Sequence, residues 1–193
     1  MSNKIIVLTS ELGSGARLVG KSLSEKLNIA FYGEEDLLIR AAHESGLDEA
    51  ILKEYDKQLV CSSLSSMDSD LSKQVFQAYS DTIFKLVEAG PCILMERGAD
   101  IILKGRKDFL SVYTYTSNSD KKIERCIRVG GITAEEAPAF IEEQSLQRER
   151  YYQSFSDIKR GKMNEYDICL NTDVFTEDAL DMTKCVDIIA ASL

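Results

Sequence analysis

The chain has 193 residues, of which 44% are hydrophobic, and this composition favours a folded globular protein over a disordered one. Lys and Arg total 23 against 32 Asp and Glu, so the formal net charge is −9, which disfavours bulk binding to nucleic acid or to an anionic membrane. Five cysteines without a C-x-x-C pair argue against a disulfide scaffold, and neither a secretory signal nor a membrane-spanning run is found. We therefore expect one cytoplasmic domain over residues 1–193.

Short apolar strands alternate with helical segments along the chain. The predicted strands are 5–8, 29–32, 92–95, 109–114 and 166–170. The predicted helices run from about 16, over 34–43, from 48 to near 60, from 71 to 87, over 120–129 and 133–160, and from about 177, with a polar loop at 62–69. This alternation predicts parallel β-α-β units, and hence an α/β three-layer sandwich around a central parallel sheet.

The turn from Ser10 to Gly15, between the first strand and the first helix, is a candidate phosphate site. A phosphate needs backbone N–H groups that converge on it, and Gly13 and Gly15 permit the tight turn that brings them close. In this register Ala16 stands where phosphate loops carry a lysine, and the guanidinium of Arg17 follows it. The alternative for Arg17 is a solvated arginine in a helix's first turn.

A second register competes with the first. Residues 15–22 match the complete G-x-x-x-x-G-K-[ST] pattern, with Lys21 as the phosphate-binding lysine. Lys21, however, falls about one turn inside the predicted helix, too far along for its ammonium to reach a phosphate at the helix start. We prefer the register at 10–15, and we assign Gly20 to close packing of the helix against the sheet.

Several strings of the sequence, in this order, resemble the cytidylate kinase-like family of bacterial P-loop proteins. They are 9–20 (TSELGSGARLVG), 31–32 (FY), 96–100 (ERGAD), 148–152 (RERYY) and 166–172 (YDICLNT). The resemblance implies a nucleoside monophosphate kinase fold with a helical substrate-binding insertion near 34–90 and a lid-like helical segment near 130–163. It also implies transfer of the γ-phosphoryl group of ATP, with Mg²⁺, to a nucleoside monophosphate or a related small acceptor.

The same resemblance implies roles for individual residues. The ATP-binding positions are Gly13, Ser14, Gly15, Ala16 and Arg17 in the loop, with Asn171 and Thr172 near the adenine. Arg97 matches a substrate-binding arginine, Asp100 belongs to the same segment, and Arg148 and Arg150 match lid arginines. With Arg17, these arginines are the catalytic candidates, because phosphoryl transfer needs positive charge around the transferring group. Without the resemblance, Arg148 and Arg150 fit a solvated helix face.

The sequence also departs from the family pattern. Gly33 replaces the aspartate that follows the Phe-Tyr pair, which leaves Glu34 or Glu35 as the substrate-side carboxylate. Glu96 is a candidate for holding a metal-bound water, for capping a helix or for an ion pair, and no metal ligands are assigned. The missing lysine supports a second hypothesis, a catalytically weak nucleotide-binding protein that acts as a sensor or through a partner. Turnover with Mg²⁺ distinguishes the two.

Overall fold

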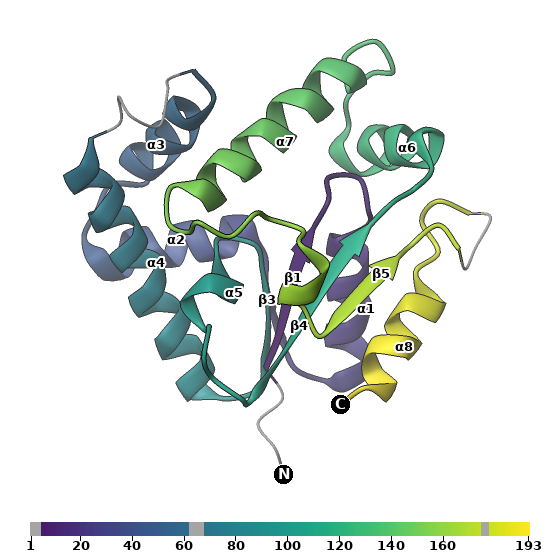
Figure 1. Ribbon diagram of the computed structural model, residues 1–193, viewed down its shortest axis with the longest axis horizontal. Helices are drawn as coiled ribbons and strands as arrows, with labels where there is room; N and C mark the ends of the chain where they lie inside the picture. The colour runs from purple at the N-terminus through teal and green to yellow at the C-terminus, as the bar shows by residue number, and fades with distance from the viewer. Residues whose placement is uncertain (1–4, 62–67, 175–177) are drawn as a thin grey trace.

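The computed structural model describes residues 5–61, 68–174 and 178–193. Its centre is a five-stranded parallel sheet in the order β2-β3-β1-β4-β5 (Figure 1). The strands are β1 Ile5–Ser10, β2 Ala30–Tyr32, β3 Cys92–Met95, β4 Phe109–Tyr115 and β5 Ile168–Asn171. Ile5 of the central strand pairs with Cys92 on one side and Phe109 on the other, and both pairings are parallel. The predicted sheet is confirmed.

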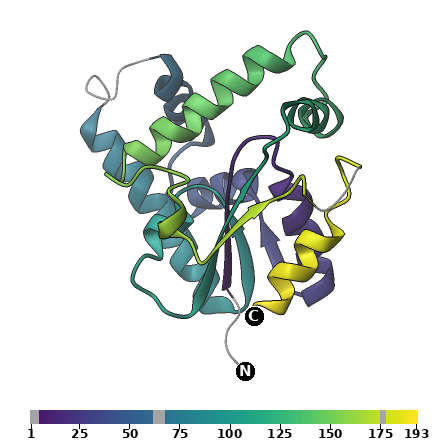
Figure 2. The same ribbon diagram turned by 45° about the vertical axis from the view of Figure 1, so that its right-hand side comes forward.

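Helices follow the strands and cover both faces of the sheet (Figure 2). They are α1 Ala16–Leu27, α2 Glu34–Ser45, α3 Glu49–Cys61, α4 Ser69–Ala89, α5 Ala99–Ile102, α6 Ser119–Gly130, α7 Ala137–Gln153 and α8 Thr183–Ala191, with a 3-10 turn, η2, at Met163–Glu165. Helices α2, α3 and α4 occupy the predicted insertion region between β2 and β3, and α7 lies in the predicted lid region. Their roles in substrate binding and closure stay predictions.

The side chains of β1 alternate between two hydrophobic clusters, because successive residues of a strand point to opposite faces of the sheet. Ile5 and Val7 join the cluster with α2, α3 and α4, whereas Ile6 and Leu8 join the cluster with α1 and α8. All four side chains are buried. Burial of both faces explains why this strand is a continuous apolar run, as in other parallel sheets.

Two predicted helices have different limits in the structure. The helix predicted over 133–160 is wrong at both ends, since α7 spans only Ala137–Gln153. Beyond it, the Phe155 ring turns back and stacks on Phe76 with 4.8 Å between ring centroids. The last helix begins at Thr183, whose N–H donates to the Asp181 carboxylate at 2.9 Å, so the predicted start near 177 is also wrong. Most of the predicted polar loop, at 62–67, lies outside the described residues.

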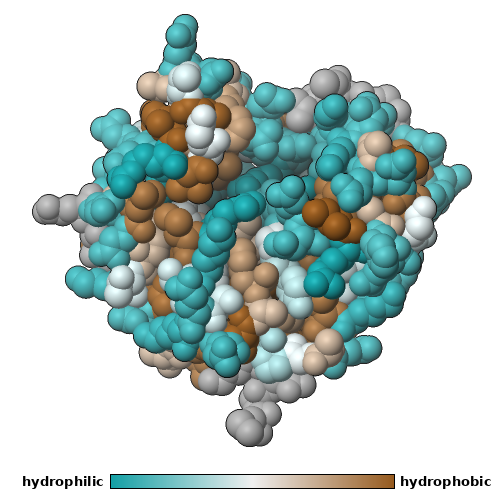
Figure 3. Space-filling model, turned by 180° about the vertical axis from the view of Figure 1, so that it is seen from behind, coloured by the Kyte–Doolittle hydropathy of each residue, from teal (hydrophilic) through white to brown (hydrophobic). Residues whose placement is uncertain are grey.

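The outer surface agrees with an acidic, mostly polar chain. Seen from behind, hydrophilic areas surround smaller hydrophobic ones, and the molecule is hollowed beside the end that carries the α6–α7 turn (Figure 3). Within the described ranges, no helix is both long enough and apolar enough to cross a membrane.

Candidate functional site

The turn between β1 and α1 has the geometry of a phosphate-binding loop. β1 ends at Ser10, α1 begins at Ala16, and both Gly13 and Gly15 adopt left-handed backbone conformations, with φ of +74° and +84°. Among the described residues, the N–H groups of Gly15, Ala16 and Arg17 donate to no backbone carbonyl. Free N–H groups at a helix N-terminus, where the helix dipole is positive, attract anions.

Close packing around this loop requires its glycines. A Cβ on Gly13 would lie 2.6 Å from Cγ and 2.9 Å from the carbonyl oxygen of Lys122 in α6, and a Cβ on Gly15 would lie 2.5 Å from Cε of Met182. The Lys122 ammonium binds the Glu11 carboxylate at the start of the loop. The loop is therefore clamped between α6 and the segment before α8, which fixes the direction of its amides.

The rest of α1 decides between the two registers. Lys21 is exposed on α1 and lines no part of the cavity beside the loop. A Cβ on Gly20 would lie 2.4 Å from the Phe31 ring of β2, so Gly20 serves close packing of helix and sheet, as predicted. The cavity wall takes its loop and α1 residues from the range 10–18, whereas the Gly20, Lys21 and Ser22 that complete the pattern at 15–22 lie outside it.

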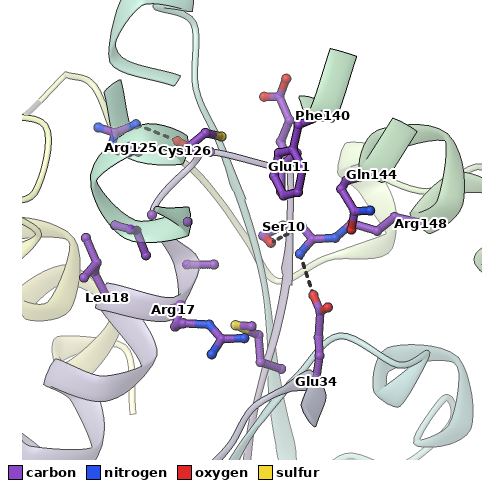
Figure 4. A pocket seen from close by; sticks show the side chains of 17 residues that line it. Ser10, Glu11, Arg17, Leu18, Glu34, Arg125, Cys126, Phe140, Gln144 and Arg148 are labelled. Atoms are coloured by element: carbon purple, nitrogen blue, oxygen red, sulfur yellow. Dashed lines mark hydrogen bonds and ion pairs between the residues drawn. The ribbon is translucent and has the colours of Figure 1, made fainter. Parts of the chain in front are cut away.

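A cavity of about 310 Å³, here called the donor cavity, opens beside the loop (Figure 4). The loop, α1, α6 and α7 supply most of its wall, which includes Gly13, Gly15, Ala16, Arg17, Leu18, Glu34, Arg125, Val129, Phe140, Gln144 and Arg148. Arg17 is exposed and, in the described part of the chain, forms no ion pair; Figure 4 shows its side chain extending from α1 into the space that Glu34 also borders. Arg17 is thus an available cation at the helix N-terminus.

Three of the predicted ATP-binding residues do not line the donor cavity. The Ser14 hydroxyl is fully buried and bonds to the Thr114 hydroxyl at 2.8 Å, so Ser14 holds the loop to the sheet. Asn171 donates to Ser117 at 2.8 Å, and buried Thr172 donates to the backbone of Tyr115. These contacts join β5 to the end of β4. The adenine-side roles of Asn171 and Thr172 stay predictions that the cavity does not support.

Arg125 of α6 is a site residue that the sequence reasoning missed. Its side chain is 2% exposed and lies 3.0 Å from the Asp173 carboxylate, and it donates to the carbonyls of Ala179 at 2.6 Å and Gly13 at 3.1 Å. It ties the loop to the segment after β5. The helical pattern gave no signal for it, because an arginine of an amphipathic helix is expected on the solvent side, whereas Arg125 and Cys126 are the buried residues of α6.

A second, smaller cavity of about 40 Å³, here called the acceptor cavity, adjoins the donor cavity at the end of β3. Glu96 and Arg97 follow β3 directly, and both adopt left-handed conformations, with φ of 65° and 55°. Such conformations cost about 1–3 kcal/mol each in residues other than glycine, and they are commonest at functional sites. Because the chain turns here, the two side chains leave the strand end in different directions.

Glu96 holds the centre of a buried ion-pair network. Its carboxylate accepts from the Ser10 N–H at 2.8 Å and from the Ser10 hydroxyl at 2.6 Å, and it lies 2.8 Å from Arg160 and 3.7 Å from Arg148. Burial alone would raise the pKa of Glu96, but the two guanidinium groups and the Ser10 hydroxyl outweigh it and hold this pKa below its ordinary value. Of the three roles considered for Glu96, the structure shows the ion pair.

Arg97 is held in place by one carboxylate and two aromatic rings. Its Nη1 donates to both oxygens of Asp56 in α3 at 2.8 Å, and its guanidinium carbon lies 5.5 Å from the ring centroids of Tyr79 and Tyr151. Burial raises the pKa of Asp56, although the positive charge of Arg97 opposes that rise. Arg97 lines the acceptor cavity with its charge already paired, and its role as a substrate-side arginine stays a prediction.

The remaining predicted residues divide between this site and other places. Arg148 lies 2.5 Å from Glu34, and both line the donor and acceptor cavities (Figure 4). Asp100 lines the acceptor cavity and accepts from the Tyr152 hydroxyl at 3.1 Å. Glu35, by contrast, is exposed outside both cavities, and Arg150 donates to the Leu59 carbonyl at 2.8 Å and so braces α7 against α3. We find these two at neither cavity.

Sequence reasoning also missed Asp56 and Arg160. Arg160 is almost buried at 9% side-chain exposure and donates to the Ser10 carbonyl and to Glu96. It was expected at the end of a long lid helix, whereas α7 ends at Gln153 and the chain returns to the sheet. No glycine or proline marks the end of α7, whose C-cap Ser154 is right-handed, so the local sequence gave no signal for that turn.

The site has no ready set of ligands for a protein-held Mg²⁺. Within the described ranges, no group of three or more His, Cys, Asp or Glu is arranged to hold a metal ion. Glu34 and Glu96 are each paired with an arginine, and Arg17 follows Ala16 where phosphate loops continue with a hydroxyl. Mg²⁺ is commonly held by nucleotide phosphates with one or two carboxylates, so a Mg²⁺ that arrives with ATP would not need a complete set of protein ligands.

A parallel sheet with a phosphate loop after β1, and with Arg148 of α7 and Arg160 of the following segment at the carboxyl ends of its strands, defines a P-loop kinase fold. The sequence model of the cytidylate kinase-like family matches residues 5–174. The chain belongs to that family. Comparison with the curated proteins returns no match.

Solved structures agree on the fold. An uncharacterized protein from Eubacterium ventriosum has a TM-score of 0.69 at 23% identity, covering 97% of this chain and 96% of that one. A shikimate kinase from Bacteroides thetaiotaomicron has a TM-score of 0.56 at 15% identity, with 97% and 96% covered. A shikimate kinase from Acinetobacter baumannii, in complex with shikimate, has 0.52 at 15%, with 97% and 93% covered. At these identities the likeness shows the fold alone.

Proposed function

We propose that this protein transfers the γ-phosphoryl group of ATP, bound with Mg²⁺, to a small acceptor, for which a nucleoside monophosphate is the family's first candidate. The observation that carries the proposal is the position of Arg148. Its guanidinium lines both cavities and reaches Ser10 at 3.4 Å and Glu34 at 2.5 Å. A phosphoryl group that crosses from the donor cavity to the acceptor cavity therefore passes beside a fixed positive charge.

On the donor side, the loop and the start of α1 supply backbone donors and one exposed cation. The free N–H groups of Gly15, Ala16 and Arg17 would bind phosphate oxygens, and the exposed Arg17 guanidinium would replace the ammonium of the usual lysine. Donors that are fixed before the reaction stabilise developing charge without reorganising. We assign ATP binding to these groups.

On the acceptor side, the ion pairs fix the geometry of the site. Arg160 and the Ser10 hydroxyl hold Glu96, and Asp56 holds Arg97, so the arginines and carboxylates around the reacting group have little freedom. Glu34, at the first position of α2, is the carboxylate that lines both cavities among the residues that the structure describes. We assign it the orientation of the attacking acceptor atom.

One observation favours the alternative of a binding protein with weak or no catalysis. No lysine belongs to the donor-cavity wall as the structure describes it. The compact ammonium that bridges the β- and γ-phosphates in other P-loop enzymes has only the longer Arg17 side chain as its substitute. Such a protein would still bind ATP, and it would act as a sensor or through a partner.

Production of ADP from ATP and Mg²⁺, with a panel of small acceptors, separates the two functions. The kinase predicts ADP formation that depends on an acceptor and falls at least about tenfold in Arg17→Ala. The binding protein predicts an ATP-dependent rise in melting temperature without ADP. Absence of both effects in the wild-type chain would overturn both proposals.

A further inference from the structure

The acceptor cavity is closed in this structure. Its volume of about 40 Å³ holds only a few water molecules, so a nucleoside monophosphate does not fit into it as it stands. Polar contacts between α3 and α7 lie beside it: the Gln147 amide donates to the Asp56 carbonyl at 2.9 Å, and Arg150 donates to the Leu59 carbonyl at 2.8 Å. An acceptor therefore enters only when contacts of this kind open.

The contacts that close the cavity are weaker than the packing of the two helices. Both α3 and α7 have apolar anchors in the core cluster on their side of the sheet, namely Leu52 and Leu59 in α3 and Tyr151 in α7. A hydrogen bond between the helices is replaced by one to water on opening, so its net contribution is small. The cavity can thus open at its polar contacts while the apolar anchors stay in the core.

Asp56 covers the guanidinium of Arg97 inside the closed cavity. Both side chains line the cavity, at 13% and 14% exposure, and Nη1 of Arg97 donates to both Asp56 oxygens at 2.8 Å. In a bidentate pair with a carboxylate or a phosphate, a guanidinium uses two of its nitrogens. Within the described ranges, Nε of Arg97 is buried and has no hydrogen-bond partner. Asp56 therefore satisfies this arginine only in part.

The carboxylate of Asp56 is itself poorly stabilised in this place. Burial raises the pKa of Asp56 although Arg97 opposes the rise, so its charged form is less stable in the cavity than in water. A phosphate group carries more charge and more acceptor oxygens than a carboxylate, and it would serve Nε of Arg97 as well as Nη1. Exchange of Asp56 for a phosphate would return an unfavourably buried carboxylate to water and complete the bonding of Arg97.

We propose that Asp56 is an internal substitute for the phosphate group of the acceptor. Without an acceptor, its carboxylate pairs with Arg97 and its backbone carbonyl binds Gln147, and the cavity stays closed. A phosphate monoester displaces the carboxylate from Arg97, and the cavity opens around it. The rings of Tyr79 and Tyr151 keep Arg97 in place during the exchange, because they contact its guanidinium independently of Asp56.

This inference rests on the proposed function and adds to it a residue that sets the affinity for the acceptor. Because the closed form competes with binding, the wild-type affinity is reduced by the fraction of molecules that are closed. Any substitution that weakens closure should therefore tighten acceptor binding, whether or not it changes a charge. A merely structural ion pair differs, since its loss would destabilise the fold without improving binding.

Calorimetric titration of the full chain with cytidine monophosphate tests the inference. Asp56→Asn keeps the shape of the side chain and removes its charge, so we expect binding at least about tenfold tighter than in wild type. Gln147→Ala keeps every charge and removes the hydrogen bond to the Asp56 carbonyl, so we expect binding about fivefold tighter. Combining Asp56→Asn with Arg97→Ala should abolish the gain, because the phosphate has lost its partner.

Glu54→Gln is the matched control, because Glu54 is exposed on the same helix and lines neither cavity, and it should bind with wild-type affinity. Unchanged or weaker binding in Asp56→Asn would overturn the inference, as would a gain that survives the loss of Arg97 or wild-type affinity in Gln147→Ala. If Asp56→Asn does not fold, Gln147→Ala decides alone. The titrations need no turnover, so a failure to form ADP would count against the proposed function and not against this inference.

Discussion

The donor and acceptor cavities lie side by side at the carboxyl ends of the strands, and the charged groups in their walls differ in how far they are paired. The donor cavity, about 310 Å³, presents backbone N–H groups and the unpaired Arg17. The acceptor cavity, about 40 Å³, is lined by arginines and carboxylates that already bind each other. The donor cavity therefore offers free groups that can bind an anion, whereas the charged groups of the acceptor cavity are largely paired with each other.

Because of this difference, we expect substitutions in the donor cavity to affect ligand binding and substitutions in the acceptor cavity to affect the stability of the fold as well. An exposed, unpaired arginine such as Arg17 contributes little to folding, so its loss should affect the ligand and little else. A buried ion pair such as Arg160–Glu96 leaves an uncompensated charge when either partner is removed, so its loss should affect the fold as well. The following variants test this contrast, from the largest expected effect to the smallest.

Glu96→Gln should be the most damaging change. It keeps the shape of the side chain but leaves Arg160, at 9% exposure, without its carboxylate. Removing one partner of a buried pair typically costs about 3–5 kcal/mol, and we expect the free energy of unfolding to fall by an amount in that range. Urea unfolding monitored by circular dichroism measures it. An unchanged midpoint would show that the network does not stabilise the fold.

We also expect the stability difference between wild type and Glu96→Gln to depend on pH. Because the pKa of Glu96 is held below its ordinary value of 4.5 in the folded state, its contribution to stability is present above pH 4.5 and is lost as the pH falls through the lower folded pKa. The difference in unfolding free energy between wild type and Glu96→Gln should therefore be largest near neutral pH and shrink below 4.5. A difference that stays constant down to pH 3 would contradict this.

Arg148→Ala and Arg150→Ala test the two predicted lid arginines against each other. Arg148 lines both cavities, whereas Arg150 donates to the Leu59 carbonyl away from them. Loss of a donor aimed at the transferring group typically costs about 10²–10³-fold in rate, and we expect this loss in Arg148→Ala. Arg150→Ala should keep its turnover and lose only about 1 kcal/mol of stability. Equal losses of rate would contradict the assignment.

A comparison of Gly13→Ala with Gly46→Ala separates the effect of close packing at the phosphate loop from the effect of backbone strain. Both glycines are left-handed, with φ of +74° and +76°, but only Gly13 has neighbours within 4 Å of an added Cβ. Gly46→Ala should cost about 1 kcal/mol of stability from backbone strain alone. Gly13→Ala should cost about 1–3 kcal/mol and also abolish the ATP-dependent rise in melting temperature, because the loop amides must move. Retained stabilisation by ATP in Gly13→Ala would show that the loop tolerates the shift.

Much of the fold was predictable from the sequence, because apolar periodicity predicts each strand and helix from its own residues, and their alternation along the chain predicts a parallel α/β sheet. The position of Lys21 inside α1 was also predictable, since it lies about one turn past the start of that helix. The ion pairs of the acceptor cavity could not be predicted from the sequence. Arg97 meets Asp56, and Arg160 meets Glu96, across 41 and 64 residues of chain. Such contacts depend on how α3 and the segment after α7 fold back, and no local pattern records that.

The central claim is that ATP binds at the register 10–15, with Arg17 as its cation. Its most direct test is the ATP-dependent rise in melting temperature of wild type, Arg17→Ala and Lys21→Ala, two exposed basic residues on the same helix. We predict that Lys21→Ala keeps the wild-type rise, and that Arg17→Ala needs at least about tenfold more ATP to reach it. Loss of the rise in Lys21→Ala, with Arg17→Ala unaffected, would contradict the claim and place the phosphates at 15–22.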